Sequence, residues 1–386
     1  MNVIISLILY VLTFIMGFVL DTSSNVNHKK RYLYVCWLYV FLCFGYTCGS
    51  DWRAYEPFYQ GLDSLYISPL ELGSLFIFEY LPSYISDYWI VAGLFKCFYL
   101  SSFLMIVKKL TQYWLSVSAL CMYLSLIFIL IDNPFRFMVG ITMINYCIYN
   151  LLDKKYIICI PLLVLSFLFH NSTIIYLLLL SLFLVVDLVA SMKKVYLLLI
   201  YVCVLILTFD TDYINQLMGR SIMLLQSSMD IKDYSTSYES QSSEAIFSIG
   251  NLIKMLVFCI ILAYRETIVC ANRYGKYIYV LALAYLLIYR VACVLPTGFR
   301  IALPFAVFYA TAIIILAKRK AILAKIILVY FCLSFVKGVY GSYSYIPYTN
   351  SIPYIITGHK SYSERSEYNI REYEEFTGKP VIIDEE

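Results

Sequence analysis

The sequence predicts an all-α membrane protein that crosses the bilayer many times. Hydrophobic residues make up 62% of its 386 residues and charged residues only 14%, whereas soluble domains average about 45–50% and about 25%. A soluble core stops growing at about 250–300 residues, so one such core cannot bury this much apolar sequence. The composition excludes a soluble enzyme fold, a secreted disulfide scaffold and a nucleic-acid-binding domain as the main architecture.

Twelve apolar stretches are candidate transmembrane helices, because a spanning helix needs about 20 mostly apolar residues, with a range of about 17–25. The first stretch lacks a preceding basic region and a small-residue cleavage site, so we expect a retained span and not a signal peptide. The stretches are 3–20, 32–48, 89–107, 113–131, 137–152, 156–169, 172–190, 195–209, 249–264, 277–294, 301–317 and 322–340.

The sixth and seventh stretches could also form one long helix with His170 in its middle, and the basic residues distinguish the two readings. Short Lys/Arg-rich loops stay on the cytoplasmic side. If two short helices separate Lys155 from Lys193, all basic clusters fall on one side, whereas a single helix would place the last ones outside. We therefore predict two helices that turn near His170. The clusters are His28 to Arg31, Lys108-Lys109, Lys154-Lys155, Lys193-Lys194, Arg265 to Lys276 and Lys318-Arg319-Lys320.

This topology places both termini and two long loops, 49–88 and 210–248, on the outer side. We predict one polytopic transmembrane domain, residues 1–340, and an outer C-terminal tail, residues 341–386. No internal repeat is visible. The twelve cysteines form no CxxC pair and mostly fall in apolar runs, where a free Cys behaves as a small hydrophobe.

Three arginines lie at or near the predicted outer side, against the usual charge bias: Arg136, Arg290 and Arg300. An Arg at the centre of a membrane helix costs roughly 2.5–3.5 kcal/mol on insertion scales, so it normally faces a partner or a watery cavity. A snorkelling or salt-bridged side chain explains each one singly. Together they indicate a pocket for an anionic lipid headgroup, because guanidinium groups bind phosphate in bidentate fashion. An anion channel is also compatible, although pores usually carry rings of charge.

His170 is the one histidine beside a predicted span, in Phe169-His170-Asn171-Ser172. It is either a structural residue, a hydrogen-bond donor to an anion or an acid/base group. No second His or Cys follows at a metal-binding spacing, so we predict no zinc. Asp210-Thr211-Asp212 resembles the acidic pair of metal-dependent glycosyltransferases, but Asp is also common at the start of a loop. We predict neither a metal nor another cofactor.

The segment from Gly49 to Tyr55 opens the first outer loop and contains Asp51, Trp52 and Arg53. This segment can be a structural feature, the start of a helix at the membrane interface with an aromatic anchor. It can also be functional, with a carboxylate that orients or deprotonates a hydroxyl and a Trp that stacks on a sugar. The nearby Glu56 is a second candidate for the carboxylate.

These segments resemble those of the EpsG-like branch of the Wzy polysaccharide polymerases, which build bacterial O-antigen and related exopolysaccharides. The first segment is similar to the family pattern R-x-G-x-D-[YW]-x-x-Y, although the first Arg of that pattern is absent. The likeness covers nearly the whole chain. Its carriers are Gly49 to Tyr55, Asn133-Pro134-Phe135-Arg136, Phe169-His170-Asn171-Ser172, Arg290, Arg300 and Tyr345-Ile346-Pro347-Tyr348.

The resemblance implies a metal-independent glycosyltransferase at the periplasmic face of the bacterial inner membrane, with both termini in the periplasm. A growing glycan would move from undecaprenyl diphosphate onto a lipid-linked repeat unit, and a chain-length regulator would be a further partner. Preorganised cations would stabilise the negative charge that develops on the diphosphate leaving group. The implied catalytic residues are Asp51, His170 and Arg290, and the implied substrate-binding residues are Trp52, Arg53, Tyr55, Arg136 and Arg300.

Three other functions fit parts of the same pattern. A lipid-linked oligosaccharide flippase also has about a dozen spans and cationic residues, but transporters usually contain structural repeats. A membrane O-acyltransferase explains His170 but not the three arginines. An O-antigen ligase performs the same chemistry on a different acceptor, and only family likeness separates it from a polymerase.

Overall fold

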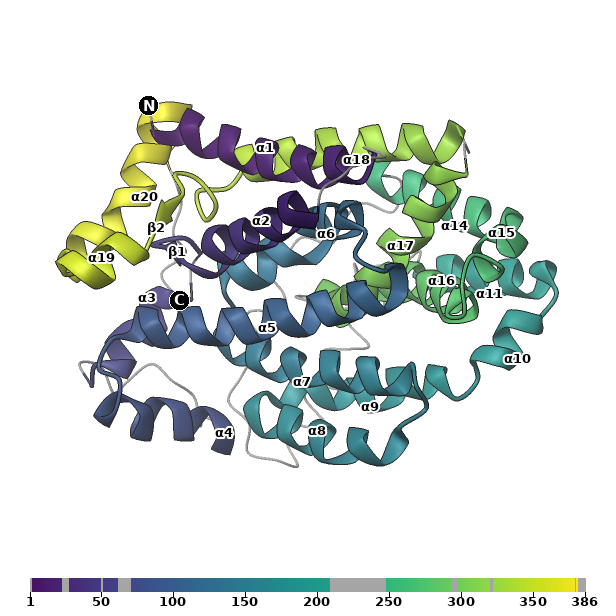
Figure 1. Cartoon of the computed structure of the whole chain (residues 1–386), viewed down its shortest axis with the longest axis horizontal. Coiled ribbons are helices and arrows are strands. Elements are labelled where there is room, and N and C mark those ends of the chain that lie inside the picture. Colours follow the sequence, from purple (N-terminus) through teal and green to yellow (C-terminus); the bar gives the residue numbers. More distant parts are fainter. Residues whose placement is uncertain are drawn as a thin grey trace. The chain divides into compact units, whose positions relative to one another are not determined.

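The computed structural model describes residues 2–22, 28–49, 51–61, 71–208, 248–292, 298–319, 322–378 and 380. This part of the chain is almost entirely helical (Figure 1), as a bilayer requires, because a helix satisfies its own backbone hydrogen bonds in lipid. Two compact units are present: unit 1 comprises Met1–Ile174 with Leu328–Glu386, and unit 2 comprises Ile175–Ile327. Each is described separately below.

Unit 1 is built around long apolar helices, with α7 packed along both α5 and α8, and α1 packed along α6. Its long helices are α1 (Asn2–Thr22), α2 (His28–Leu38), α5 (Tyr88–Thr111), α6 (Leu115–Cys121), α7 (Phe135–Leu151) and α8 (Tyr156–Phe169). Wide helical turns extend α2 through Tyr39–Cys43 and α6 through Met122–Leu126 and Phe128–Asp132. The region between α2 and α5 contains α3 (Trp52–Tyr59), α4 (Leu72–Leu75) and the turn Phe76–Tyr80.

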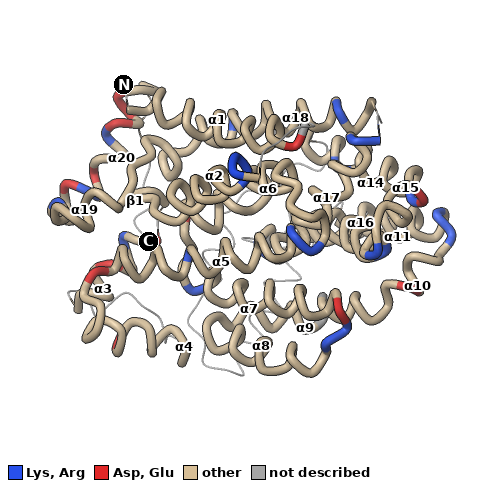
Figure 2. The backbone as a smooth tube through the Cα atoms, in the orientation of Figure 1, with Lys and Arg blue, Asp and Glu red and all other residues tan. Residues whose placement is uncertain are grey.

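The C-terminal part of unit 1 begins within α18 (Ile322–Tyr340) and contains α19 (Ile352–Thr357) and α20 (Tyr362–Thr377). The short strand β2 (Thr349–Asn350) pairs antiparallel with β1 (Gly45–Tyr46). Charged residues are frequent on α20, where Figure 2 shows alternating red and blue positions, whereas α1 is almost uncharged. The tail is therefore a polar helical segment attached to an apolar bundle.

Unit 2 is organised around α16, which packs against every other long helix of the unit. α17 begins after a tight helical segment, Gly298–Phe305, that contains Pro304. The helices are α9 (Ile175–Leu180), α10 (Val186–Ser191), α11 (Lys194–Leu207), α14 (Ile249–Ala263), α15 (Arg265–Val269), α16 (Gly275–Ala292) and α17 (Ala306–Lys318).

The described residues of the twelve predicted stretches are mostly helical, although the stretch 32–48 ends in strand β1. The predicted break at His170 is confirmed. α8 ends at Phe169, and His170 is extended, with φ −159° and ψ 113°. The stretch 172–190 differs from a single span, because tight turns divide it into short helices.

Among the described residues, five helices are long and apolar enough to cross a membrane: Asn2–Asp21, Tyr88–Thr111, Gly275–Ala292, Phe299–Lys318 and Ile322–Tyr340. The protein is thus an all-α, multi-pass membrane protein. The count of twelve crossings, their orientation and the division at residue 340 stay predictions.

Basic clusters that are far apart in the sequence meet at one end of unit 2. Lys194 Nζ donates to the carbonyl of Ala263 at 3.0 Å, and Arg265 Nη1 donates to the carbonyl of Met192 at 3.0 Å. α15 also packs against α17, which ends at Lys318. This grouping supports the predicted placement of these three clusters on one side of the membrane.

Candidate functional site

Three of the sequence segments singled out above meet in unit 1. Gly49 has a φ of +81°, and a Cβ there would lie 2.2 Å from the carbonyl oxygen of Asp132. The Gly49 amide donates to the carbonyl of Ser344 at 2.8 Å. A side chain at position 49 would therefore both strain the backbone and separate the first segment from the second.

An ionic cluster lies beside this junction. At the start of α7, Arg136 Nε donates to the Tyr55 hydroxyl at 3.0 Å and Nη1 donates to Glu71 Oε2 at 2.9 Å. The other oxygen of Glu71, Oε1, accepts from the Asn171 amide at 3.2 Å and lies 3.3 Å from His170 Nδ1. One carboxylate thus contacts both Arg136 and His170, which the sequence placed in separate motifs.

Glu71 is strongly held as a carboxylate. Burial alone would raise its pKa, but His170, backbone amides and Arg136 together lower the pKa to about 2. Only 8% of the Glu71 side chain is exposed, against 22% for Arg136 and 21% for His170. The buried carboxylate therefore orients the Arg136 guanidinium and the His170 imidazole, and both side chains remain partly exposed.

Asp51 belongs to the same neighbourhood through Tyr55. Burial raises the pKa of Tyr55, the Asp51 carboxylate raises it further, and Arg136 opposes both effects. The Asp51 carbonyl accepts from the amides of Ala54 and Tyr55, which starts α3. Asp51, Tyr55, Glu71, Arg136 and His170 are called the ionic cluster below.

Trp52 and Arg53 hold the loop to the C-terminal tail. The Trp52 side chain is fully buried, and its ring lies 5.5 Å from that of Trp89 and 5.8 Å from that of Tyr362. Arg53 donates to the carbonyls of Gly49 at 2.9 Å and Ser366 at 3.0 Å. The Trp52 indole is thus covered on the sides of Trp89 and Tyr362, and the roles of Trp52 and Arg53 in substrate binding stay predictions.

Glu56, the second candidate base, lies in a buried ion pair. Its Oε2 accepts from Arg365 Nη1 of α20 at 2.5 Å, and its Oε1 accepts from Trp89 Nε1 at 3.0 Å. The exposed fractions of the Glu56 and Arg365 side chains are 1% and 5%. Because both oxygens are occupied and shielded, Glu56 is a structural carboxylate.

Arg290 lies in unit 2 and is also buried. Its Nε and Nη2 donate to Thr208 Oγ1 at 3.0 Å and to the Thr208 carbonyl at 3.2 Å, while Nη1 finds no hydrogen-bond partner within the described ranges. It lines a small cavity with Lys254, whose ammonium lies 3.5 Å from the ring centre of Tyr289. Two cations therefore border one cavity.

Arg300 also belongs to unit 2, where its carbonyl accepts from the Tyr176 hydroxyl at 2.9 Å. The structure thus brings Arg136 and His170 together in unit 1 and places Arg290 and Arg300 in unit 2. Convergence of all four on one cavity stays a prediction.

Sequence reasoning missed Glu71 and two lysines within helices, the buried Lys96 of α5 and the half-buried Lys254 of α14. Lys96 is 1% exposed. Both lysines interrupt predicted spans, and an ionisable residue inside a span is itself a signal for a functional or paired site. Glu71 carried no such signal, because it lies in an irregular loop.

The metal alternative rested on Asp210 and Asp212, which lie outside the described residues. Within the described ranges, no group of three or more His, Cys, Asp and Glu side chains is arranged to hold a metal ion.

The fold and this site define a multi-pass α-helical membrane protein with a partly exposed cationic cluster held by a buried carboxylate. The family model of the EpsG family matches residues 30–350, so the chain belongs to the EpsG family. EpsG-like proteins are Wzy-type polymerases. The family indicates a polysaccharide polymerase-like membrane protein with glycosyltransferase-like activity. No curated protein and no solved structure matches this chain.

The pKa of Glu71 predicts how the ionic cluster responds to acid. A carboxyl whose folded-state pKa is lowered stabilises the protein above its unfolded-state pKa, about 4.5, and loses this contribution as the pH falls toward about 2. We expect the stability difference between wild type and Glu71→Gln to be similar at about pH 7 and 5, and smaller at about pH 3.5. Thermal unfolding of the detergent-purified proteins measures it. The same comparison in a His170→Gln background shows whether the effect depends on the facing imidazole. A difference that already disappears at about pH 5 would contradict the assignment.

Proposed function

We propose that this protein is a polysaccharide polymerase that moves a growing glycan from undecaprenyl diphosphate onto a lipid-linked repeat unit. The reaction takes place at the periplasmic face of the bacterial inner membrane. The observation that carries the proposal is the ionic cluster, in which one buried carboxylate contacts two partly exposed side chains, Arg136 and His170. The cluster lies within the residues that match the family, which further supports this assignment.

The proposed chemistry needs no redox step. The bond between the sugar C1 and the diphosphate oxygen breaks, and the acceptor hydroxyl oxygen bonds to C1. The diphosphate leaves with the bonding electron pair, and the hydroxyl proton passes to a base, for which we propose Asp51. Arg136 and His170 stabilise the developing negative charge, which is most effective when the donors are already oriented. Glu71 supplies that orientation by holding both side chains.

Unit 2 supplies a second set of cations in this proposal. Arg290 offers Nη1 to the donor diphosphate, and its other nitrogens are fixed on Thr208. Lys254 borders the same cavity, and Arg300 contributes from the start of the following helix. A chain-length regulator is the proposed protein partner.

Reconstitution tests the function. Purified full-length protein in vesicles that contain lipid-diphosphate-linked repeat units should produce a ladder of longer lipid-linked glycans, and EDTA should not stop it. Transfer of repeat units across the bilayer without lengthening would instead identify a flippase. Transfer only onto a lipid A core would identify a ligase, and loss of activity in EDTA would restore the acidic pair Asp210 and Asp212 as a metal site.

The Arg290→Lys variant tests whether the reaction needs the geometry of the guanidinium group or only its positive charge. Lys keeps the charge but lacks the guanidinium fork, so we expect chain growth in the vesicle assay to fall by about 10²–10³ at normal protein abundance. Arg273→Lys, at the basic end of the same unit, is the matched control and should keep full activity. Full-length polysaccharide from the Arg290→Lys protein would remove Arg290 from the mechanism.

A further inference from the structure

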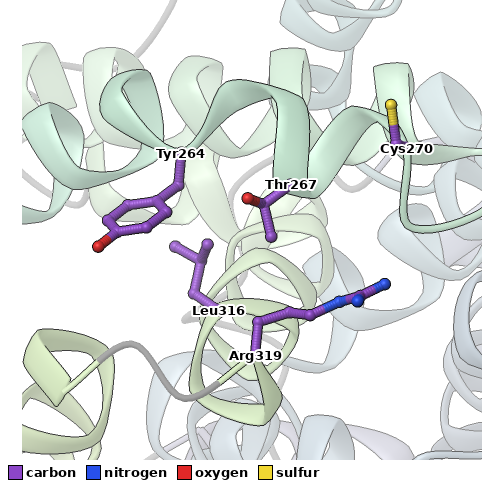
Figure 3. A pocket seen from close by; sticks show the side chains of 5 residues that line it. All are labelled: Tyr264, Thr267, Cys270, Leu316 and Arg319. Atoms are coloured by element: carbon purple, nitrogen blue, oxygen red, sulfur yellow. The ribbon is translucent and has the colours of Figure 1, made fainter.

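A pocket of about 380 Å³ lies at the basic end of unit 2. Tyr264, Thr267 and Cys270 line it from the connection between α14 and α16, and Leu316 and Arg319 line it from the end of α17 (Figure 3). Ligand pockets usually measure about 300–1,000 Å³, so this volume suits a small headgroup. The pocket belongs neither to the ionic cluster nor to the Arg290 cavity.

The lining combines one cation, two hydroxyls and an apolar wall. Arg319 is exposed, and its guanidinium forms no ion pair or hydrogen bond with the residues that the structure describes. In Figure 3 its side chain extends beneath the segment that carries Thr267 and Cys270. The hydroxyls of Tyr264 and Thr267 are potential donors, and Leu316 with the Tyr264 ring supplies the apolar surface. This set fits a phosphate group attached to an apolar body.

The surrounding charge is also positive. Lys194 and Arg265 lie at the same end of the unit, held by the carbonyls of Ala263 and Met192. The acidic Glu266 is balanced by Arg265 at 3.8 Å. An anion that approaches this end therefore meets more cations than carboxylates.

The position along the chain distinguishes a lipid from a soluble phosphate. The candidate span Phe299–Lys318 ends one residue before Arg319, and the candidate span Ile322–Tyr340 begins three residues after it. Arg319 thus lies at a membrane boundary, where phospholipid headgroups are concentrated and where basic pockets between helices bind anionic lipids. Tyr264 directly follows α14 and is an aromatic residue of the kind enriched at this level.

We propose that this pocket binds the phosphate of an anionic phospholipid headgroup at the end of the protein that carries the basic loops. Arg319 contacts the phosphate in bidentate fashion, and the Thr267 hydroxyl donates to a remaining oxygen. Leu316 and the Tyr264 ring contact the glycerol and the first acyl carbons. The site does not depend on the glycan chemistry proposed above.

Lipid binding by the full-length protein in detergent tests the proposal, with native mass spectrometry as readout. Phosphatidylglycerol should bind more tightly than phosphatidylcholine, and Arg319→Gln should weaken phosphatidylglycerol binding at least about tenfold, since it removes charge and hydrogen bonds together. Arg319→Lys should bind several-fold more weakly than wild type, and Thr267→Val should also reduce binding. Unchanged thermal unfolding of each variant shows that its fold is intact.

Lys318→Gln is the matched control, because it removes the same charge from the neighbouring exposed residue, which does not line the pocket. General attraction to an anionic surface is worth about 1 kcal/mol, or about fivefold, per basic residue, so this variant should lose no more than that. If Lys318→Gln and Arg319→Gln lose the same amount of phosphatidylglycerol affinity, the lipid is attracted by the general surface charge and the proposed pocket site is wrong. If glycerol 3-phosphate competes as strongly as the lipid, the ligand is a soluble phosphate and not a membrane lipid.

Discussion

Replacing Arg136 with alanine is expected to reduce polysaccharide chain growth by about 10²–10³, because one preorganised donor is lost at the leaving group. The same change leaves Glu71 without its closest cation, at 2.9 Å, and Tyr55 without its hydrogen-bond donor. His170 then loses the fixed position that the shared carboxylate provides. Arg136→Lys should recover only a small part of the activity, since a single ammonium cannot contact Tyr55 and Glu71 together in the fork geometry. Chain length on lipid-linked product, normalised to protein abundance, is the measurement.

Arg371→Ala is the matched control, because Arg371 is an exposed arginine on α20 outside the ionic cluster. It should leave chain growth unchanged. Glu71→Gln should also impair chain growth while preserving both cations, which tests orientation separately from charge. Normal chain length from Arg136→Ala at normal abundance would contradict the proposed role of the cluster.

Breaking the Glu56–Arg365 pair is expected to have the largest effect on stability. Removing one partner of a buried ion pair leaves an uncompensated charge and typically costs about 3–5 kcal/mol. Both side chains are almost completely buried, and Trp89 Nε1 also loses its acceptor if Glu56 is replaced by alanine. We therefore expect Arg365→Ala and Glu56→Ala each to lower the unfolding temperature markedly and to reduce protein abundance.

The double variant Glu56→Ala/Arg365→Ala should be less destabilised than the sum of the two single variants, because neither charge is then left alone. The exposed pair Lys276–Asp187, with exposed fractions of 54% and 71%, is the matched control. Asp187→Asn should change stability by less than about 1 kcal/mol. A similarly small effect for Arg365→Ala would show that the tail is not held by this pair.

The sequence predicted the apolar helices and the break at His170, because hydrophobic runs and basic clusters are local signals. It also placed Arg136, His170 and Asp51 in one candidate site from motif likeness, and Arg136 and His170 do meet in unit 1. Glu71, which joins them, was missed because Arg136 and His170 are 65 and 99 residues away in the sequence. Contacts between polar residues so far apart in the sequence leave no periodic hydrophobic pattern from which they could be predicted.

The interpretation of Trp52 differed for a related reason. Its exposure is decided by α20, which approaches from more than 300 residues further along the chain through Arg365 and Asn369. A single local pattern, an aromatic residue in an outer loop, fits both a sugar platform and a buried anchor. Only the tertiary packing distinguishes them.

The attachment of α20 also constrains the order in which the protein is built. Unit 1 is discontinuous, so the ribosome completes all of unit 2 before it synthesises the residues that close unit 1. α20 contacts the N-terminal part of the sequence twice: Asn2 donates to the Tyr368 hydroxyl at 2.9 Å, and Asn369 donates to the Thr47 carbonyl at 2.8 Å. Until those last residues emerge, Glu56 has no cationic partner and Trp52 is uncovered. The loop that carries Asp51 and Tyr55 therefore matures only after α20 has been synthesised, and a nascent chain released before α20 would carry an inserted bundle with an unfinished site.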